Sequence, residues 1–237
     1  AFSTTGGVLA QHIEVSPKSE QQTVNCLDLN SNENNLICSG SNDGSITIWD
    51  LNESLKQSAT LSPTIPIPND EVLSVAWNKQ VKSIIASVTN SNVYIYDTRK
   101  KEQTTPIMQC LGSWSCVAYI SKAVCWSHTH ATSLIVASAN DANPHLQIWD
   151  LRYANCLLRY LKGGHNRGIV TVAWNPFDEQ IILSAAKDNT TCLWNPTVGP
   201  NDNPLISVIP SVTNQWINDI KWCSWEPSLF AVGSLDG

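Results

Sequence analysis

The sequence predicts an all-β fold built from repeated units of about four short strands, and three observations lead to this prediction. First, four tryptophans recur at separations of 49, 48 and 48 residues, namely Trp77, Trp126, Trp174 and Trp222. Second, β-branched runs alternate with clusters of Asn, Asp, Gly and Ser, which is typical of antiparallel meanders. Third, no segment carries a sustained apolar stripe at helical spacing. Units of this length and kind stack as the blades of a β-propeller.

Each unit has the same order of elements. A period-2 run leads to the first Trp of the unit, or to Leu29 in the first unit. A β-branched run follows, then a tight turn of Asn, Asp and Gly type, then a run that ends in an aromatic residue. These third runs close at Trp49-Asp50, Tyr96-Asp97, Trp149-Asp150 and Trp194-Asn195. We expect one propeller domain over residues 1–237, with blades at approximately 22–52, 70–99, 120–152, 165–196 and 214–237.

Composition and charge exclude several classes of protein. Apolar residues make up 42% and charged residues 14%, against roughly 25% charged in an average soluble domain. A disordered tail or a coiled coil would need far more charge, and no run approaches the length of a transmembrane helix. The net charge of −6 argues against nucleic acid as a partner. The basic cluster Arg99-Lys100-Lys101 is interpreted as a solvated turn.

The cysteines indicate a reducing compartment. The eight Cys contain no Cys-x-x-Cys pair, and most lie inside apolar runs, where Cys acts as a small hydrophobe. No signal peptide is visible, and the chain lacks an initiator Met, so a processed or trimmed piece is expected. The glycosylation sequons at Asn52 and Asn189 are interpreted as chance matches. Together these features predict a cytoplasmic protein.

The Trp-Asp dipeptide at the end of the third run is typical of WD repeats. One unit carries the complete polar set of such repeats, His165, Ser184, Asp188 and Trp194. In WD repeats these side chains form a hydrogen-bonded chain inside the blade. The chemistry fits, because a buried Asp needs donors and His, Ser and Trp supply them. We therefore predict a structural role for these four residues.

The other units carry parts of this set. The first keeps Ser39, Asp43 and Trp49, whereas the second reads Thr89-Asn90-Ser91-Asn92 in place of the turn Asp and is expected to be less rigid. The alternative for the complete set is a Ser-His-Asp catalytic triad. It is disfavoured, because Ser184 and Asp188 flank a β-turn and no Gly-x-Ser-x-Gly sequence exists.

No other motif points to catalysis or to a cofactor. His128 and His130 form a His-x-His pair, but it falls where a loop is expected, and spacing supplies no third ligand. Phosphate-binding Gly-rich loops are missing as well. The sequence therefore predicts no metal, no cofactor and no enzymatic activity. A scaffold of this kind binds partners through loops on the two faces of the disc, and the fold alone does not name the partner.

Several longer runs resemble one family of WD-repeat proteins. They are DEVLSVAWN from Asp70, LQIWDLRYAN from Leu146, KGGHNRGIVTVAWNP from Lys162, SAAKDNTTCLWNP from Ser184 and PSLFAVGSLDG from Pro227. The last unit adds Trp216, Asp219, Trp222 and Cys223 at a characteristic spacing. Over approximately residues 22–237 the chain resembles the N-terminal propeller of the large cage-forming subunit of the COPII vesicle coat.

The resemblance implies a structural coat protein that shapes carriers leaving the endoplasmic reticulum for the Golgi. The implied partners are a smaller WD-repeat subunit, bound through regions outside this chain, and other coat propellers at cage vertices. The inner coat would be contacted indirectly. The implied location is cytoplasmic, on coated vesicles and on the cytosolic face of endoplasmic reticulum exit sites. Membrane association would be peripheral and indirect, because no amphipathic or lipidated anchor is visible.

The chain departs from the family in its number of blades. The family propeller has seven blades, and about five units are readable here. We therefore expect an incomplete view of a longer propeller, with the segment Gly6–Val15 as the tail of a preceding blade. A closed five-bladed ring completed by that segment would contradict this expectation. The rival function is a WD-repeat adaptor that binds peptides or proteins, as ubiquitin-ligase substrate receptors and chromatin readers do. An adaptor would concentrate Arg and aromatic residues around one mouth of the central channel.

Overall fold

The computed structural model describes residues 22–52, 56–61, 70–90, 92–99, 108–109, 121–153, 157–199, 202–210 and 215–236. The segment Gly6–Val15, two residues of the basic cluster (Lys100 and Lys101) and three of the cysteines (Cys110, Cys116 and Cys156) lie outside these residues. The described elements are eighteen β-strands and one short 3-10 helix, Leu151–Tyr153. The prediction of an all-β fold is confirmed.

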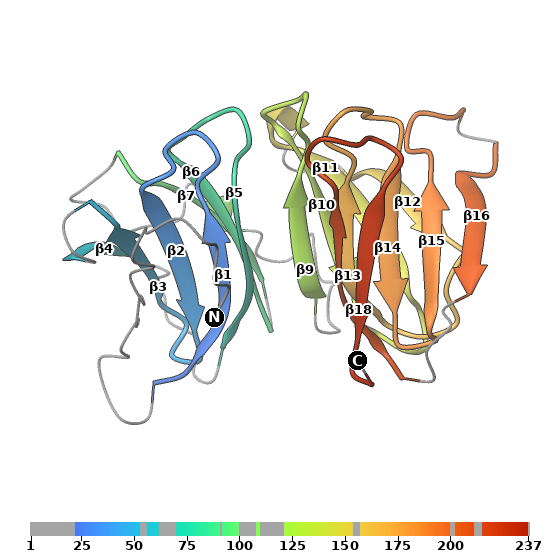
Figure 1. The fold of residues 1–237 in the computed structure, drawn as a ribbon, viewed down its shortest axis with the longest axis horizontal. Coiled ribbons are helices and arrows are strands. Elements are labelled where there is room, and N and C mark those ends of the chain that lie inside the picture. Colours follow the sequence, from blue (N-terminus) through green and yellow to red (C-terminus); the bar gives the residue numbers. More distant parts are fainter. Residues whose placement is uncertain are drawn as a thin grey trace, which may run out of the picture.

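The strands form five antiparallel sheets that follow one another along the chain (Figure 1). We number them as blades one to five. Blade one contains β1 (Val24–Leu29), β2 (Leu36–Ser41), β3 (Ile46–Asp50) and β4 (Lys56–Leu61). Blade two contains β5 (Val72–Trp77), β6 (Ile84–Thr89), β7 (Val93–Asp97) and β8 (Met108–Gln109). Blade three contains β9 (Ser121–Trp126), β10 (Ser133–Ser138), β11 (His145–Asp150) and β12 (Leu157–Lys162). Blade four contains β13 (Ile169–Trp174), β14 (Ile182–Ala186), β15 (Thr190–Trp194) and β16 (Leu205–Pro210), and blade five contains β17 (Ile217–Trp222) and β18 (Phe230–Ser234).

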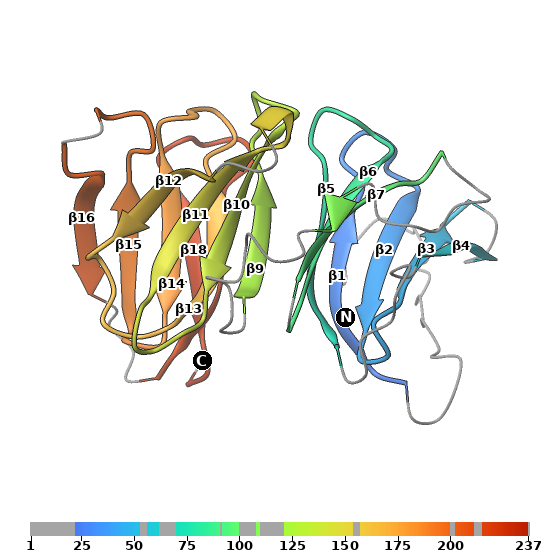
Figure 2. The same ribbon diagram turned by 180° about the vertical axis from the view of Figure 1, so that it is seen from behind.

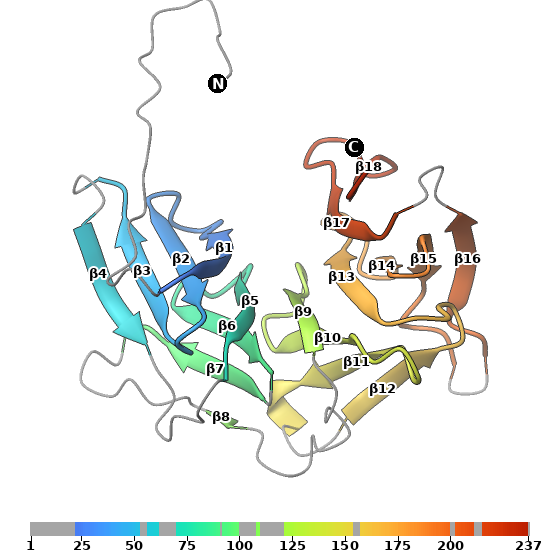
Figure 3. The same cartoon turned by 90° about the horizontal axis from the view of Figure 1, so that it is seen from below.

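The blades are arranged radially, as in a propeller. Figure 3 shows the first strands β1, β5, β9, β13 and β17 nearest the centre, with β4, β8, β12 and β16 toward the rim. Figure 2, from behind, shows separate sheets stacked beside one another rather than one continuous barrel. The arc stays open between β1 and β17, so the five blades do not form a closed ring.

The core lies between neighbouring blades, and the first-strand tryptophans occupy it. Trp77 packs with Cys38 and Ile46 between blades one and two, and Trp126 packs with Val88 between blades two and three. The remaining seams contain Trp174 and Trp194 between blades three and four, and the partly buried Trp222 between blades four and five. Large flat side chains fill the space between two sheets, since each buries a large apolar area. This packing accounts for the buried Trp of the described blades, whereas Trp216 and Trp225 are exposed.

Turn chemistry and bulges recur with the blade period. The turn from β2 to β3 contains Gly44 at a φ of +80°, and the turn from β14 to β15 contains Asn189 at a φ of 60°. Glycine and asparagine tolerate this left-handed conformation better than other residues do. The pairing of the first and second strands shifts register near the start of β1, β5, β13 and β17. Such bulges twist and re-aim a strand, here at the inner edge of each blade.

The fourth strands follow the aromatic residue that ends each repeat signature. β12 begins at Leu157 and β16 at Leu205, beyond the ranges 120–152 and 165–196 expected for these blades. The linkers before these strands differ in length, and the strands carry no shared motif. Spacing and composition therefore gave no signal for them.

Candidate functional site

The polar residues of blade four meet inside the blade. Trp194 Nε1 donates to Ser184 Oγ at 2.7 Å, and His165 Nε2 lies 2.7 Å from the same oxygen. On the other side of the ring, His165 Nδ1 lies 3.0 Å from Thr190 Oγ1 and 3.3 Å from Asp188 Oδ1. Thr190 Oγ1 donates to Asp188 Oδ1 at 2.7 Å. The structure thus brings all four sequence-predicted residues together and adds Thr190.

The hydrogen-bonded network of blade four favours the ionised form of Asp188. Burial by itself would raise the pKa of the Asp188 carboxyl. Hydrogen bonds from His165, from the backbone N–H of Asn166 and from Thr190 outweigh that effect and hold the pKa well below its usual range. Ser184 is fully buried, and its hydroxyl is engaged by both Trp194 and His165. Without access to a substrate, this arrangement has the character of an internal hydrogen-bond network.

Blade one builds a similar chain with a different residue. Trp49 Nε1 donates to Ser39 Oγ at 2.9 Å, and Gln22 Nε2 donates to Asp43 Oδ2 at 2.9 Å. Gln22 is buried and lies just before the first strand, as His165 does in blade four. Sequence reasoning missed Gln22, because a glutamine gives no motif signal.

Blade three has a hydrogen-bonded chain that is made of other residues. Trp149 Nε1 donates to Gln147 Oε1 at 3.1 Å, and the Gln147 amide lies 2.9 Å from His145 Nε2. His145 Nδ1 lies 2.8 Å from the carbonyl oxygen of Asn143. Burial lowers the pKa of His145, which favours a neutral ring that accepts from Gln147 and donates to the carbonyl. In blade two, which lacks the turn Asp, Thr89 Oγ1 donates to Asp70 Oδ2 at 2.8 Å.

The Asp residues of the Trp-Asp dipeptides hold the turn after the third strand. Asp50 Oδ1 accepts from the Asn35 amide at 3.0 Å and from the backbone N–H of Asn52 at 2.9 Å. Asp150 accepts from the guanidinium of Arg152 through Nε and Nη2 and from its backbone N–H. These hydrogen bonds outweigh the effect of burial and lower the pKa of Asp150 to about 2.

The first-strand tryptophans differ in their polar contacts. Trp126 Nε1 donates back to the carbonyl of Ala76 in blade two at 3.0 Å, and Trp222 Nε1 donates to that of Ala173 in blade four at 3.2 Å. Trp77 is fully buried, but its Nε1 has no hydrogen-bond partner among the described residues. Similar positions in the repeat therefore contribute differently to the seams between blades.

Buried asparagines form a second set of links across the seams. The side-chain amides of Asn30, Asn78 and Asn175 donate to a carbonyl of the next blade at 3.0, 2.6 and 3.0 Å, respectively. Each Asn Oδ1 also accepts two backbone N–H groups of its own loop. The acceptors in the next blade are the carbonyls of Lys82, Ala131 and Pro227. Sequence reasoning missed these residues, although an Asn directly after the first strand was visible in three repeats.

Blade three has Ser127 in place of this asparagine. Ser127 Oγ still accepts the backbone N–H groups of Thr129 and His130, at 3.2 and 3.0 Å. It has no amide to reach blade four. In blade four itself, Trp174 Nε1 donates to the carbonyl of Glu179, in the loop that follows its own strand, at 2.9 Å. Trp174 is therefore bonded within its own blade, unlike Trp126 and Trp222, which bond to the preceding blade.

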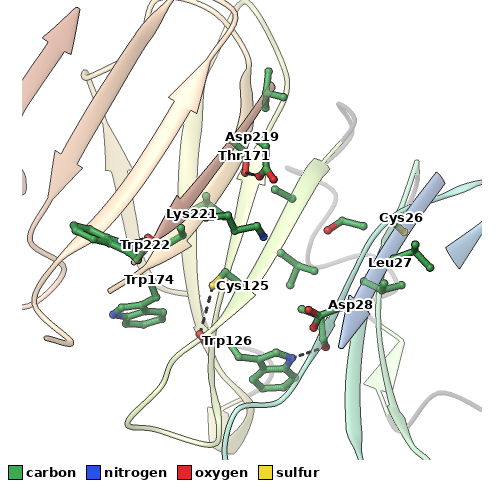
Figure 4. A pocket seen from close by; sticks show the side chains of 18 of the residues that line it. Cys26, Leu27, Asp28, Cys125, Trp126, Thr171, Trp174, Asp219, Lys221 and Trp222 are labelled. Carbon is green, nitrogen blue, oxygen red and sulfur yellow. Dashed lines mark hydrogen bonds between the residues drawn. The ribbon is translucent and has the colours of Figure 1, made fainter. Parts of the chain in front are cut away.

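The first strands of all five blades line a central channel of about 610 Å³ (Figure 4). Asp28 in the channel accepts the backbone N–H of Trp77 at 2.7 Å and lies 3.5 Å from Lys79 Nζ. Lys221 also projects into the channel (Figure 4). Burial, with a smaller contribution from Lys79, lowers the pKa of His128. The channel wall thus mixes both signs of charge and presents no dominant anion or cation site.

Several observations bear on the predicted absence of metal, cofactor and membrane segments. In the part of the chain that the structure describes, no group of three or more metal-ligating side chains comes together. His130 Nδ1 lies 3.2 Å from Glu179 Oε2, so its contact is to the next blade. The described cysteines are free, and burial raises the pKa of Cys26 to about 11 and that of Cys192 to about 12. No helix among the described residues has the length and hydropathy that a membrane crossing needs.

Comparison with known families agrees with this architecture. The family described as "WD domain, G-beta repeat" matches residues 11–50 and 155–195. The chain contains WD40 repeats in these two regions. Its two matched regions include β1–β3 of blade one and the complete polar set of blade four.

Among curated proteins, the chain is similar in sequence to members of the Sec31 group. The chain is 36% identical over 223 residues to the protein transport protein Sec31A of Danio rerio, which covers 93% of this chain and 17% of that protein. It is 33% identical over 215 residues to Sec31B of Mus musculus, covering 90% and 18% of the two chains. The corresponding values for SEC31 of Candida glabrata are 32% over 231 residues, 93% and 18%. The chain therefore spans less than a fifth of the length of these relatives.

Solved structures give the same result for the fold. A structure described as "COPII on membranes, outer coat vertex" matches with a TM-score of 0.76 and 30% identity, over 89% of this chain and 55% of that chain. "The structure of the COPII coat assembled on membranes" matches with the same TM-score and identity, over 89% and 30%. The resemblance to the coat propeller inferred from sequence motifs is confirmed.

Proposed function

We propose that these WD40 repeats belong to a structural scaffold subunit of the COPII outer coat. The scaffold would support vesicle budding and protein export from the endoplasmic reticulum to the Golgi. The observation that carries this proposal is the match to an outer coat vertex structure, with a TM-score of 0.76 and 30% identity over 89% of the chain. Both sequence and fold are shared, which is stronger support than a propeller fold alone would give.

The use of polar side chains within the blades supports a scaffold rather than an enzyme. His165 and Ser184 are buried, Asp188 is partly buried, and their side chains are bonded to one another and to Trp194. The side chains of the seam asparagines, Asn30, Asn78 and Asn175, are likewise hydrogen-bonded to backbone groups. We infer that the protein acts through protein–protein contacts of its blades and not through chemistry in this domain.

The proposed partners are those of a coat subunit. They are a smaller WD-repeat subunit bound outside this chain, other coat propellers at cage vertices, and the inner coat indirectly. The net charge of −6 supports the absence of a nucleic-acid partner. We propose a cytoplasmic location, peripheral on coated vesicles and at endoplasmic reticulum exit sites, with other subunits making the membrane contact.

Localisation and cargo export test this proposal. A fluorescently tagged full-length protein should form puncta that coincide with the inner coat on the endoplasmic reticulum. Its depletion should slow the exit of secretory cargo, and the full-length protein, but not a version lacking residues 22–236, should restore export. A pull-down of the full-length protein should recover a smaller WD-repeat protein. A diffuse or nuclear protein whose depletion leaves export unchanged would refute the coat function and favour the adaptor alternative.

A further inference from the structure

A second pocket, separate from the central channel, lies at the seam between blades three and four. Its volume is about 300 Å³. Its wall is largely apolar, with Ile148, Leu158, Trp174 and Pro196, and its polar groups include Arg159 and Glu179. Leu158 is 52% exposed, whereas Ile148 and Trp174 are each 6% exposed. The pocket therefore has a buried apolar floor and an accessible rim, as small-ligand and side-chain pockets have.

Arg159 is the unusual charge of this pocket. Its Nη1 donates to the carbonyls of Pro196 and Val198, and its Nη2 donates to that of Gly199 at 2.8 Å. All three acceptors are neutral backbone groups. Among the described residues, no carboxylate lies within ion-pair distance of Arg159, and its Nε–H has no hydrogen-bond partner. The pocket wall thus holds a partly buried guanidinium without a counter-charge.

Two other arginines of the fold show the usual arrangement. Arg99 forms a bidentate pair with Asp97, and Arg152 forms one with Asp150. Both pairs use Nε and Nη2 of the guanidinium. In Arg159, Nε is unoccupied, and Nη2 uses one of its two N–H groups for Gly199. The Nε–H and one N–H of Nη2 therefore remain to donate to a carboxylate.

The acidic group of the pocket already has partners. Glu179 Oε2 accepts from Thr129 Oγ1 at 2.8 Å and lies 3.2 Å from His130 Nδ1. These contacts hold its carboxylate on the side of the β9–β10 loop, where it would repel a second acidic group. The charges of the lining residues therefore favour one carboxylate near Arg159, not a polyanion.

We propose that this pocket binds a short linear segment of a partner protein that has one large apolar side chain beside a single acidic residue. The apolar side chain occupies the cavity against Ile148 and Trp174, and the carboxylate accepts from the Nε–H and Nη2–H of Arg159. The bounding strand β12 is the outermost strand of its sheet, so its outer backbone groups can pair with an extended segment. This binding site does not depend on the coat function and would remain if that function were wrong.

A peptide series tests the assignment. The probe is a fluorescein-labelled peptide, Ser-Gly-Ser-Leu-Asp-Ser-Gly-Ser, titrated with the full-length protein and followed by fluorescence anisotropy. We expect saturable binding that weakens about tenfold when Asn replaces Asp, because a charge-assisted hydrogen bond is lost. Ser in place of Leu should remove binding. Equal binding of a peptide with Lys in place of Asp, or no binding of the Leu-Asp peptide up to about 1 mM, where even weak specific contacts register, would overturn the proposal.

Protein variants locate the binding to this pocket. Thr197→Trp places a large side chain at an exposed position of the pocket rim and should abolish binding. Arg159→Gln should weaken binding of the Leu-Asp peptide about tenfold but leave that of the Leu-Asn peptide unchanged, which separates loss of charge from disturbance of the loop. Arg152→Gln is the matched control and should have no effect. Unchanged binding to Thr197→Trp would overturn the proposal.

A second pair of variants guards against misfolding of Thr197→Trp. Leu158→Ser removes an exposed apolar side chain from the pocket, and Leu229→Ser removes one of similar exposure (56%) outside it. Only Leu158→Ser should weaken binding of the Leu-Asp peptide. Equal weakening by both substitutions, or by neither, would contradict a site between blades three and four.

Discussion

The indole N–H of Trp194 and the hydroxyl of Ser184 form a 2.7 Å hydrogen bond between two adjacent strands of blade four. Trp194 is 1% exposed and Ser184 is 0% exposed. His165 Nε2 shares the same hydroxyl from the loop that enters the blade. One buried oxygen therefore joins three segments of the blade, and neither nitrogen can turn to water if that oxygen is removed.

Removal of this oxygen should destabilise blade four more than the same change in blade one. Ser184→Ala leaves both Trp194 Nε1 and His165 Nε2 without a partner, so we expect a loss of roughly 2–4 kcal/mol in the free energy of unfolding. Ser39→Ala leaves one nitrogen, Trp49 Nε1, without a partner and removes a longer bond of 3.4 Å to the Thr47 carbonyl, and it should lose roughly 1–2 kcal/mol. Urea unfolding followed by tryptophan fluorescence gives both values. Equal losses would contradict a network centred on Ser184.

Acid stability should depend on Asp150. Its folded-state pKa of about 2 lies below the unfolded value of about 3.9. The ionised carboxylate therefore stabilises the fold above roughly pH 4, and this contribution is lost as the pH falls from about 4 to about 2. Asp150→Asn should lower stability at pH 7 and flatten the dependence in that range. Arg152→Gln keeps the carboxylate but raises its folded-state pKa toward the unfolded value, so this variant should also lose less stability between about pH 4 and about pH 2. An unchanged acid slope in Asp150→Asn would contradict the assignment.

The seam between blades two and three should weaken when Asn78 is replaced by Ser. This change reproduces the residue that blade three has at the matching position, so it can keep the loop contacts but loses the 2.6 Å bond to the Ala131 carbonyl. We expect a loss of roughly 1–2 kcal/mol and faster hydrogen exchange in β9 and β10. The control is Asn32→Ser, because Asn32 is an exposed residue whose amide contact to the Asn78 carbonyl is longer, at 3.2 Å, and should matter less. Equal effects of the two variants would argue against a seam role for Asn78.

Two tryptophans should respond differently to the same substitution. Trp77→Phe removes a buried N–H that has no partner among the described residues, whereas Trp126→Phe breaks the bond to the Ala76 carbonyl. Both changes remove the same atoms from a fully buried position, so the packing losses are comparable. Trp126→Phe should therefore cost about 1 kcal/mol more than Trp77→Phe. Thermal and urea unfolding of the two variants supply the comparison, and a larger loss for Trp77→Phe would show that packing, not hydrogen bonding, controls the difference.

Features with short-range causes were predictable from the sequence. The alternation of apolar and polar residues in β13 and β14 and the turn at Asp188-Asn189 depend on residues close together in the chain. The strands, the turns and the repeat period could therefore be predicted. The set His165, Ser184, Asp188 and Trp194 was also readable, because each residue occurs at a characteristic place in the repeat. Gln22 was not, since a glutamine acquires its role only when the loop before β1 folds over the turn that holds Asp43.

The sequence by itself determined an all-β chain of WD40 units, the period of the blades and the residue types that fill the seams. Only the tertiary structure decided which donor reaches which acceptor across a seam, as with Asn78 and Ala131 or Trp126 and Ala76. It also decided that Arg159 bonds to backbone carbonyls of blade four and to no carboxylate among the described residues. The physical reason is the separation along the chain between the residues that interact. Alternating hydrophobicity and turn chemistry act between near neighbours in the chain, whereas the asparagine links join residues 52 or 53 positions apart, which only the stacking of whole sheets brings together.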